Sequence, residues 1–198
     1  MKKKPYPKIQ KLINNALKVC ISFIVPLMMV EQFIIIIITK KLKLTLTLKR
    51  KWGLIISPFF NIMNDSEARQ LTKETSLIKA GRAIRAMGAQ YVAIKKGEHG
   101  ALLFGENEFF SCGAYPLEDI HDPTGAVDTF AGGIAGYLAG AVKNVTLTDL
   151  RKAMIYGSVL ASFTVEAFSL ERLRRLAMKD VDARYEAFKS MSQFEFSE

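Results

Sequence analysis

Strands and helices alternate along residues 61–198, and this alternation restricts the packed part of the chain to the α/β class. Apolar spacing and stop signals predict helices at Ser66–Leu71, Leu77–Met87, Thr129–Ala141, a segment capped by Thr148 that reaches at least Ala161, and Val181–Met191. Apolar runs between turn residues predict strands at Tyr91–Lys95, Ala101–Phe104 and Glu108–Ser111, with a tight turn at Lys96–Gly100. The 198 residues suffice for one such domain, or for one domain with an appendage.

The beginning of the chain differs from the rest in composition. Residues 1–60 contain one glycine and one alanine, whereas residues 61–198 contain twelve and nineteen. Residues 1–51 carry 12 Lys or Arg and one acid, a formal charge of +11, and residues 52–198 carry 16 and 18, a formal charge of −2. The sequence therefore predicts a basic, apolar leader at residues 1–51 and a packed domain at residues 52–198.

The leader is open to three interpretations. Residues 19–38 are long and apolar enough for a membrane segment, although Glu31 and Pro26 oppose insertion. The leader is otherwise a poorly ordered extension, such as non-native coding sequence from a truncated or frame-shifted gene, or a set of elements that pack on the domain. Nucleic-acid binding is disfavoured, because the lysines flank apolar runs without a recognisable binding fold.

Few side chains are available for metal or hydrolytic chemistry. Cys20 and Cys112 cannot form a disulfide framework, and the cysteines and histidines have no zinc-site spacing. His99 and His121 are the only histidines, which disfavours a His-rich metal site and a Ser-His-Asp triad.

The segment Asp122–Gly133 joins a glycine-containing loop to the start of a helix. Unpaired N–H groups at a helix N-terminus, together with the helix dipole, can receive a phosphate. Asp128 lies in the first turn, where a carboxylate can accept the proton of an alcohol while the amides hold the phosphoryl charge. The segment suits phosphoryl transfer, and a capped helix that uses Gly133 and Gly136 for close packing explains it equally well.

This segment resembles the C-terminal signature D-x-T-G-A-G-D-x-F of the ribokinase-like (PfkB) sugar and nucleoside kinases. Upstream, Asn64–Glu67 matches the family's N-x-x-E motif, and Val92–Gly100 matches its strand with G-x-x-G; downstream, Ala161–Phe168 resembles its adenine-side helix and loop. The motifs follow the family's order over roughly residues 61–190. The resemblance implies a three-layer α/β/α sandwich, incomplete here because residues 1–60 contain no counterpart of the family's N-terminal half and lid.

The resemblance also implies ATP-dependent phosphoryl transfer to a hydroxyl of a sugar or nucleoside, in the cytoplasm, with ATP and Mg²⁺ as cofactors and K⁺ as a candidate monovalent cation. The catalytic base would be Asp128, and the anion hole would comprise Gly125, Ala126 and Val127. The nucleotide would contact Asn64, Lys96, Gly97, Gly100, Ser158 and Ser162. Glu67 would organise magnesium indirectly, and Asp122 and Thr124 would hold the monovalent cation. The alternative function is that of a non-catalytic remnant or a membrane-tethered module.

Two residues depart from the family pattern. Val127 replaces the second glycine of G-A-G-D, and its branched side chain adds bulk where a phosphate would approach the backbone. Ser169 stands where a glycine commonly follows the V-E-x-F element.

Overall fold

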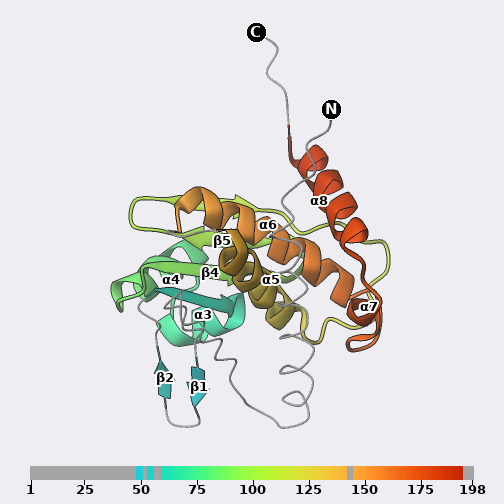
Figure 1. Ribbon diagram of the computed structural model, residues 1–198. Coiled ribbons are helices and arrows are strands. Elements are labelled where there is room, and N and C mark those ends of the chain that lie inside the picture. The colour runs from blue at the N-terminus through green and yellow to red at the C-terminus, as the bar shows by residue number, and fades with distance from the viewer. Residues whose placement is uncertain (1–47, 51–52, 56–58, 142–144, 194–198) are drawn as a thin grey trace.

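The computed structural model describes residues 48–50, 53–55, 59–141 and 145–193 (Figure 1). The candidate membrane segment 19–38 and the leader boundary after residue 51 lie outside the described residues. Within the described ranges, no helix combines the length and the apolar character needed to cross a bilayer.

A mixed four-stranded sheet forms the centre of the domain. Its strands lie in the order β3 (Phe60–Asn64), β4 (Tyr91–Lys95), β5 (Ala101–Phe104) and β6 (Phe109–Cys112). β3 and β4 run parallel, with Phe60 opposite Tyr91 and Asn64 opposite Lys95, while the other neighbours pair antiparallel. The carboxyl ends of β3 and β4 therefore meet at one edge, at Asn64 and Lys95. A separate antiparallel pair is formed by β1 (Leu48–Arg50) and β2 (Gly53–Ile55).

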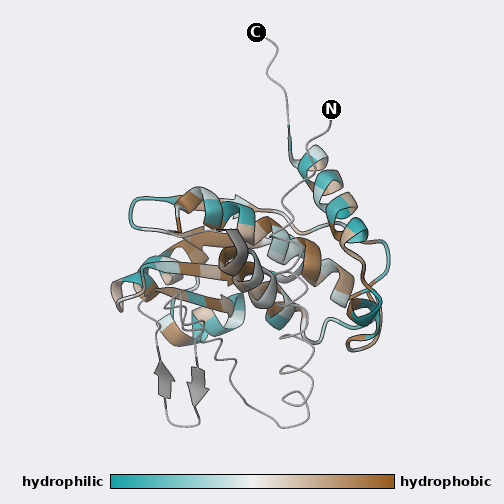
Figure 2. Cartoon of the chain, in the orientation of Figure 1, coloured by the Kyte–Doolittle hydropathy of each residue, from teal (hydrophilic) through white to brown (hydrophobic). Residues whose placement is uncertain are grey.

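Helices cover both faces of the sheet. The two layers are α3 (Asp65–Thr72) with α4 (Leu77–Ala86), and α5 (Ala126–Ala141) with α6 (Leu147–Thr164). Val92 and Ile94 pack in the cluster with α3 and α4, whereas Ala93 packs in the cluster with α5 and α6. This alternation follows from the two-residue period of a strand, and Figure 2 shows the hydrophobic strands between the helices. The expected α/β/α layering is confirmed for the described residues.

α5 and α6 approach each other closely through glycine. A Cβ atom at Gly157 would lie 2.7 Å from the carbonyl oxygen of Phe130, and one at Gly133 would lie 2.8 Å from the Gly157 Cα. Only a residue without a side chain allows this helix spacing, so the packing use of Gly133 foreseen from the sequence is confirmed.

Two further helices follow α6. They are α7 (Glu171–Arg174) and α8 (Met178–Ser192). Val181 and Phe188 of α8 pack in one buried cluster with Val159 and Phe163 near the end of α6. α8 is thereby anchored to the helix layer rather than to the sheet (Figure 1).

The structure corrects several predicted boundaries. Thr148 is not the N-cap of α6: the cap is Thr146, because Thr146 and Asp149 form a reciprocal capping box. α5 begins at Ala126, three residues before the predicted start at Thr129. β3 was not predicted at all. The remaining predicted helices and strands are present, with ends displaced by at most three residues.

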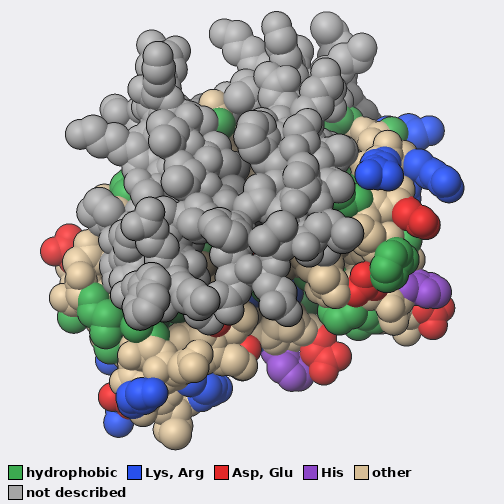
Figure 3. Space-filling model, turned by 90° about the horizontal axis from the view of Figure 1, so that it is seen from below, with side chains coloured by type: hydrophobic (Ala, Val, Ile, Leu, Met, Phe, Trp, Pro, Cys, Tyr) green, Lys and Arg blue, Asp and Glu red, His purple; other side chains and the backbone are tan. Residues whose placement is uncertain are grey.

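The described surface carries mixed charge. On the face seen in Figure 3, Lys and Arg side chains are interspersed with Asp and Glu among the described residues. This distribution agrees with the small formal charge of residues 52–198 and gives no extended basic patch on the described part of that face.

Candidate active site

A cavity of about 650 Å³ opens beside the carboxyl ends of β3 and β4. Its walls come from the start of α3, the turn after β4, the loop between β6 and α5, and one face of α6. The predicted site residues that line it are Asn64, Gly97, Gly100, Ala126, Val127, Ser158 and Ser162. The fold thus brings together residues nearly 100 positions apart in the sequence. Lys96, Gly125, Asp128, Glu67, Asp122 and Thr124 do not line it.

The N-x-x-E motif is the capping box of α3. The side-chain oxygen Oδ1 of Asn64 accepts a hydrogen bond from the Glu67 N–H at 2.8 Å, and the Glu67 carboxylate accepts one from the Asn64 N–H at 3.0 Å. This reciprocal pair satisfies two backbone donors at the start of the helix. It also holds the Glu67 carboxylate against the backbone N–H of the cavity residue Asn64.

Asp128 lies in the first turn of α5 and is half-buried. Burial raises the pKa of its carboxyl group, and the nearby Glu67 carboxylate raises that pKa further. Within the described part of the chain, the Asp128 side chain has no hydrogen bond or ion pair. A bound metal ion or its water shell would offset the repulsion between these two neighbouring carboxylates.

The start of α5 supplies backbone donors beside Asp128. Gly125 has φ +79°, a left-handed conformation that favours glycine, and its carbonyl accepts the first helical bond from Thr129 at 2.8 Å. The Ala126 N–H donates to the Pro123 carbonyl at 3.2 Å. Among the described residues, the N–H groups of Gly125, Val127 and Asp128 have no acceptor. Of the three predicted anion-hole residues, Gly125 and Val127 keep their N–H groups available, and Asp128 adds a third.

The G-x-x-G element forms a tight 3₁₀ turn, Gly97–His99, that closes with a bond from the Lys96 N–H to the Gly100 carbonyl at 2.8 Å. Gly100 has φ +86°, and a Cβ atom there would lie 2.0 Å from the Cys112 carbonyl oxygen. No other residue fits at this position.

The lysine that lines the cavity is Lys95, not the predicted Lys96. Its ammonium donates to the Gly97 carbonyl at 3.1 Å, and burial lowers the pKa of this side chain. Because Lys95 is the last residue of β4, the direction of its side chain follows from the strand register, which the sequence alone did not distinguish for the adjacent lysines.

Asp122 joins the loop before α5 to the loop after α6. Its two carboxylate oxygens accept hydrogen bonds from the N–H groups of Thr124 (2.9 Å) and Ser169 (3.3 Å), and the hydrogen bonds from Thr124 and Ser169 lower the pKa of Asp122. Ser169 has φ +56°, a conformation that favours glycine. In the described residues no group of three or more His, Cys, Asp or Glu side chains could hold a metal ion.

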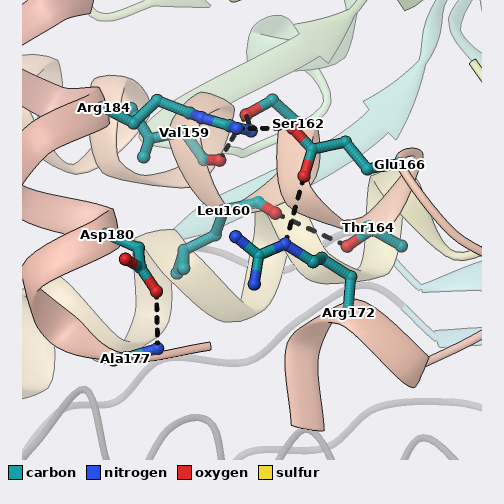
Figure 4. A network of polar contacts seen from close by, with 9 residues as sticks. All are labelled: Val159, Leu160, Ser162, Thr164, Glu166, Arg172, Ala177, Asp180 and Arg184. Carbon is teal, nitrogen blue, oxygen red and sulfur yellow. Dashed lines mark hydrogen bonds and ion pairs between the residues drawn. The ribbon is translucent and has the colours of Figure 1, made fainter. Parts of the chain in front are cut away.

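One face of α6 completes the cavity. Ser158, Ala161, Ser162 and Val165 follow the spacing of three and four that places residues on one helix face. The Ser162 hydroxyl donates to the Val159 carbonyl at 2.7 Å and accepts from Arg184 of α8 at 2.9 Å (Figure 4). Tyr115, in the loop between β6 and α5, also lines the cavity. Sequence reasoning did not identify Tyr115 or Arg184, since neither belongs to a motif.

Comparison with known proteins agrees with this architecture. A model of the pfkB family of carbohydrate kinases matches residues 45–172. The cytidine kinase of Thermococcus kodakarensis is 40% identical over 80 residues, which cover 39% of this chain and 28% of that protein.

Solved structures with the same fold include the aminoimidazole riboside kinase of Salmonella enterica, in complex with aminoimidazole riboside and an ATP analog. Its TM-score is 0.57 at 23% identity, over 64% of this chain and 41% of that one. A fructokinase double mutant from Vibrio cholerae O395, bound to fructose, ADP and potassium, has a TM-score of 0.53 at 22% identity, over 65% and 40%. At these identities the likeness shows the fold. The chain spans less than half the length of each of these proteins.

Proposed function

The chain belongs to the pfkB family of carbohydrate kinases, and from this premise we propose that it takes part in ATP-dependent phosphoryl transfer to a hydroxyl group of a sugar or nucleoside. The observation that carries the proposal is what the start of α5 holds: the half-buried Asp128 carboxylate and the N–H groups of Gly125, Val127 and Asp128, which have no acceptor among the described residues. Val127 and Ala126 of the same turn line the cavity. The relatives named as cytidine, riboside and fructose kinases support the acceptor class.

The residues present fit a nucleotide with its magnesium ion. The cavity volume of about 650 Å³ lies within the range of small-molecule sites. Asn64, the Gly97–Gly100 turn and Ser158 would hold the nucleotide, and Glu67 would approach Mg²⁺ through water, as magnesium sites that keep much of their hydration shell do. Bound ATP would supply the phosphoryl group, and Mg²⁺ would offset its charge.

The protein groups have separate tasks in this proposal. Asp128 would take the proton of the acceptor hydroxyl at a carboxylate oxygen, and burial with Glu67 nearby makes this carboxylate a stronger base than an exposed one. The N–H groups of Gly125, Val127 and Asp128 would stabilise the negative charge that develops on the transferred group. Gly125 directly precedes α5 and the other groups lie in its first turn, so the start of one helix carries both the base and the donors.

The proposal is tested with the whole 198-residue chain. We expect Mg²⁺–ADP to raise the melting temperature, since a ligand at 100 times its Kd adds about 2.7 kcal/mol to the free energy of unfolding. We expect ATP consumption with at least one member of a panel of pentoses, hexoses and nucleosides, and its loss in Asp128→Asn with ADP binding retained. A folded sample whose melting temperature does not respond to millimolar Mg²⁺–ADP would refute the nucleotide site, and activity that survives Asp128→Asn would refute the base.

A further inference from the structure

Helix α8 lies beyond the segment that the family model matches, residues 45–172, yet one of its side chains reaches the cavity wall. Arg184 is largely buried, with 16% of its side chain exposed. It donates through Nη1 to the Ser162 hydroxyl and pairs through Nη2 with the Glu166 carboxylate. Its guanidinium carbon lies 4.8 Å from the centre of the Tyr115 ring. One guanidinium thus contacts two cavity residues from different segments, Ser162 of α6 and Tyr115 of the loop between β6 and α5.

The surroundings hold this guanidinium in one orientation. Arg184 also lies over the Phe163 ring, 3.5 Å from its centre. Its partner Glu166 accepts a second hydrogen bond, from Arg172 at 3.3 Å (Figure 4). A planar fork with several donors can bond a carboxylate and a hydroxyl at once while stacking on rings. A lysine has no such fork.

This contact limits what Ser162 can offer to a ligand. A serine hydroxyl has one donor and two acceptor lone pairs. The Ser162 hydroxyl donates its proton to the Val159 carbonyl and accepts from Arg184 at one lone pair. One lone pair remains, so Ser162 can only accept a hydrogen bond from a ligand. Ser162 lines the cavity beside apolar residues such as Ala161, Val165 and Leu117, the setting in which a planar base would lie.

Resting on the proposed nucleotide site, we infer that Arg184 is a positioning residue that makes Ser162 an acceptor-only group and thereby selects a nucleotide base with an exocyclic amino group. Adenine offers an amino donor to that acceptor. Hypoxanthine carries a carbonyl at the same ring position, and two acceptors facing each other leave both unsatisfied. Without Arg184, the Ser162 hydroxyl can rotate and donate to the carbonyl instead.

The test measures ADP and IDP binding by calorimetry on the whole chain, because the two nucleotides differ at this ring position. The wild-type protein should bind ADP roughly tenfold more tightly than IDP, the value expected for one hydrogen bond. Arg184→Met should bring the two affinities within about twofold of each other, while pyrophosphate binding stays unchanged. Arg172→Met is the matched control, because Arg172 contacts Glu166 and Phe163 but neither Ser162 nor Tyr115, and it should keep the wild-type ratio.

Each outcome has a definite meaning. Equal affinities in the wild-type protein, or an unchanged ratio in Arg184→Met, would overturn the inference while leaving the nucleotide site intact. Absence of binding by either nucleotide in the wild-type protein would instead overturn the proposed function. If Arg184→Met does not fold, Ser162→Ala decides, because it removes the hydroxyl and leaves Arg184 paired with Glu166: loss of the ADP preference supports the inference, and its retention contradicts it.

Discussion

The Asp122 carboxylate accepts a hydrogen bond from the Ser169 N–H at 3.3 Å, across 47 residues of sequence. This bond ties the loop that precedes α5 to the loop that follows α6, and a second bond between the same loops runs from the His121 N–H to the Val165 carbonyl at 2.8 Å. Both loops border the cavity, so their connection holds its rim in place.

Replacing Ser169 with glycine should stabilise the protein. A residue other than glycine in the left-handed region destabilises the folded state by about 1–2 kcal/mol. Glycine removes this strain, but it also increases the entropy of the unfolded chain, which offsets part of the gain. We therefore expect the free energy of unfolding to rise by about 0.5–1 kcal/mol in urea titration. Lys73, with φ +60° at the end of α3, offers a matched site away from the cavity, and Lys73→Gly should give a similar gain. A lower midpoint for Ser169→Gly would mean that its side chain makes a compensating contribution.

Asp128→Asn should increase stability at neutral pH. Because the pKa of Asp128 is raised in the folded protein, its ionised form is less favourable in the folded than in the unfolded state. The gain should be present above the folded pKa and should disappear as pH falls below the unfolded value of about 3.9, where both states become protonated. Melting temperatures of the two proteins between pH 4 and 8 measure this difference. A constant difference across that range would contradict the assignment to Asp128.

The contact between α5 and α6 should not tolerate a methyl group. Gly157→Ala places a Cβ atom 2.7 Å from the Phe130 carbonyl oxygen, a backbone atom that can move only with its helix. Overpacking of this kind typically costs about 1–3 kcal/mol. Gly113→Ala is the control, since a Cβ atom there meets nothing within 4 Å. Equal denaturation midpoints for the two variants would show that the helices can separate without loss.

The N-cap of α6 distinguishes the structure from the sequence prediction. Thr146→Ala removes the side-chain acceptor for the Asp149 N–H and should cost about 1 kcal/mol in the free energy of unfolding. Thr148→Ala alters an exposed residue inside the first turn and should change stability by less than about 0.5 kcal/mol. Chemical denaturation of both variants measures the difference, and a larger loss for Thr148→Ala would restore the cap predicted from the sequence.

Val127→Gly should tighten the binding of ADP. Val127 lines the cavity, and its N–H has no acceptor among the described residues, so its branched side chain stands where a phosphate would approach that donor. We expect a few-fold lower dissociation constant in calorimetry, with Val127→Ala between the two. An equal or weaker affinity would show that the valine is accommodated.

The local elements could be predicted from the sequence because each has a local cause. The strand Tyr91–Lys95 ends at a glycine turn, and the helix beginning at Leu77 follows the N-cap Ser76, so pattern and capping suffice. β3 escaped prediction because its run Phe60–Asn64 contains buried Asn61 and alternates poorly. Its identity as a strand depends on pairing with β4, which lies about 30 residues away in the sequence.

The residues of the candidate site likewise include some that the local sequence indicates and others that depend on contacts between distant segments. Gly125 and Asp128 stand at a loop-to-helix junction whose spacing has a physical meaning, whereas Asn64 could be named only because its N-x-x-E segment resembles the family's motif. Arg184 and Tyr115 meet through the packing of α8 on α6, and nothing in their local sequence indicates that contact. The choice between Lys95 and Lys96 required the strand register as well.

The reciprocal bonds between Asn64 and Glu67 have a consequence for how the site forms. These bonds nucleate the first turn of α3 and at the same time orient the carboxylate next to Asp128. The positions of the Asn64 side chain and the Glu67 carboxylate therefore depend on the first turn of α3, and we expect them to form and to be lost together with that turn. Fraying of α3 at its N-terminus would free the Asn64 side chain and the Glu67 carboxylate together, while the Asn64 backbone stays in β3 opposite Lys95.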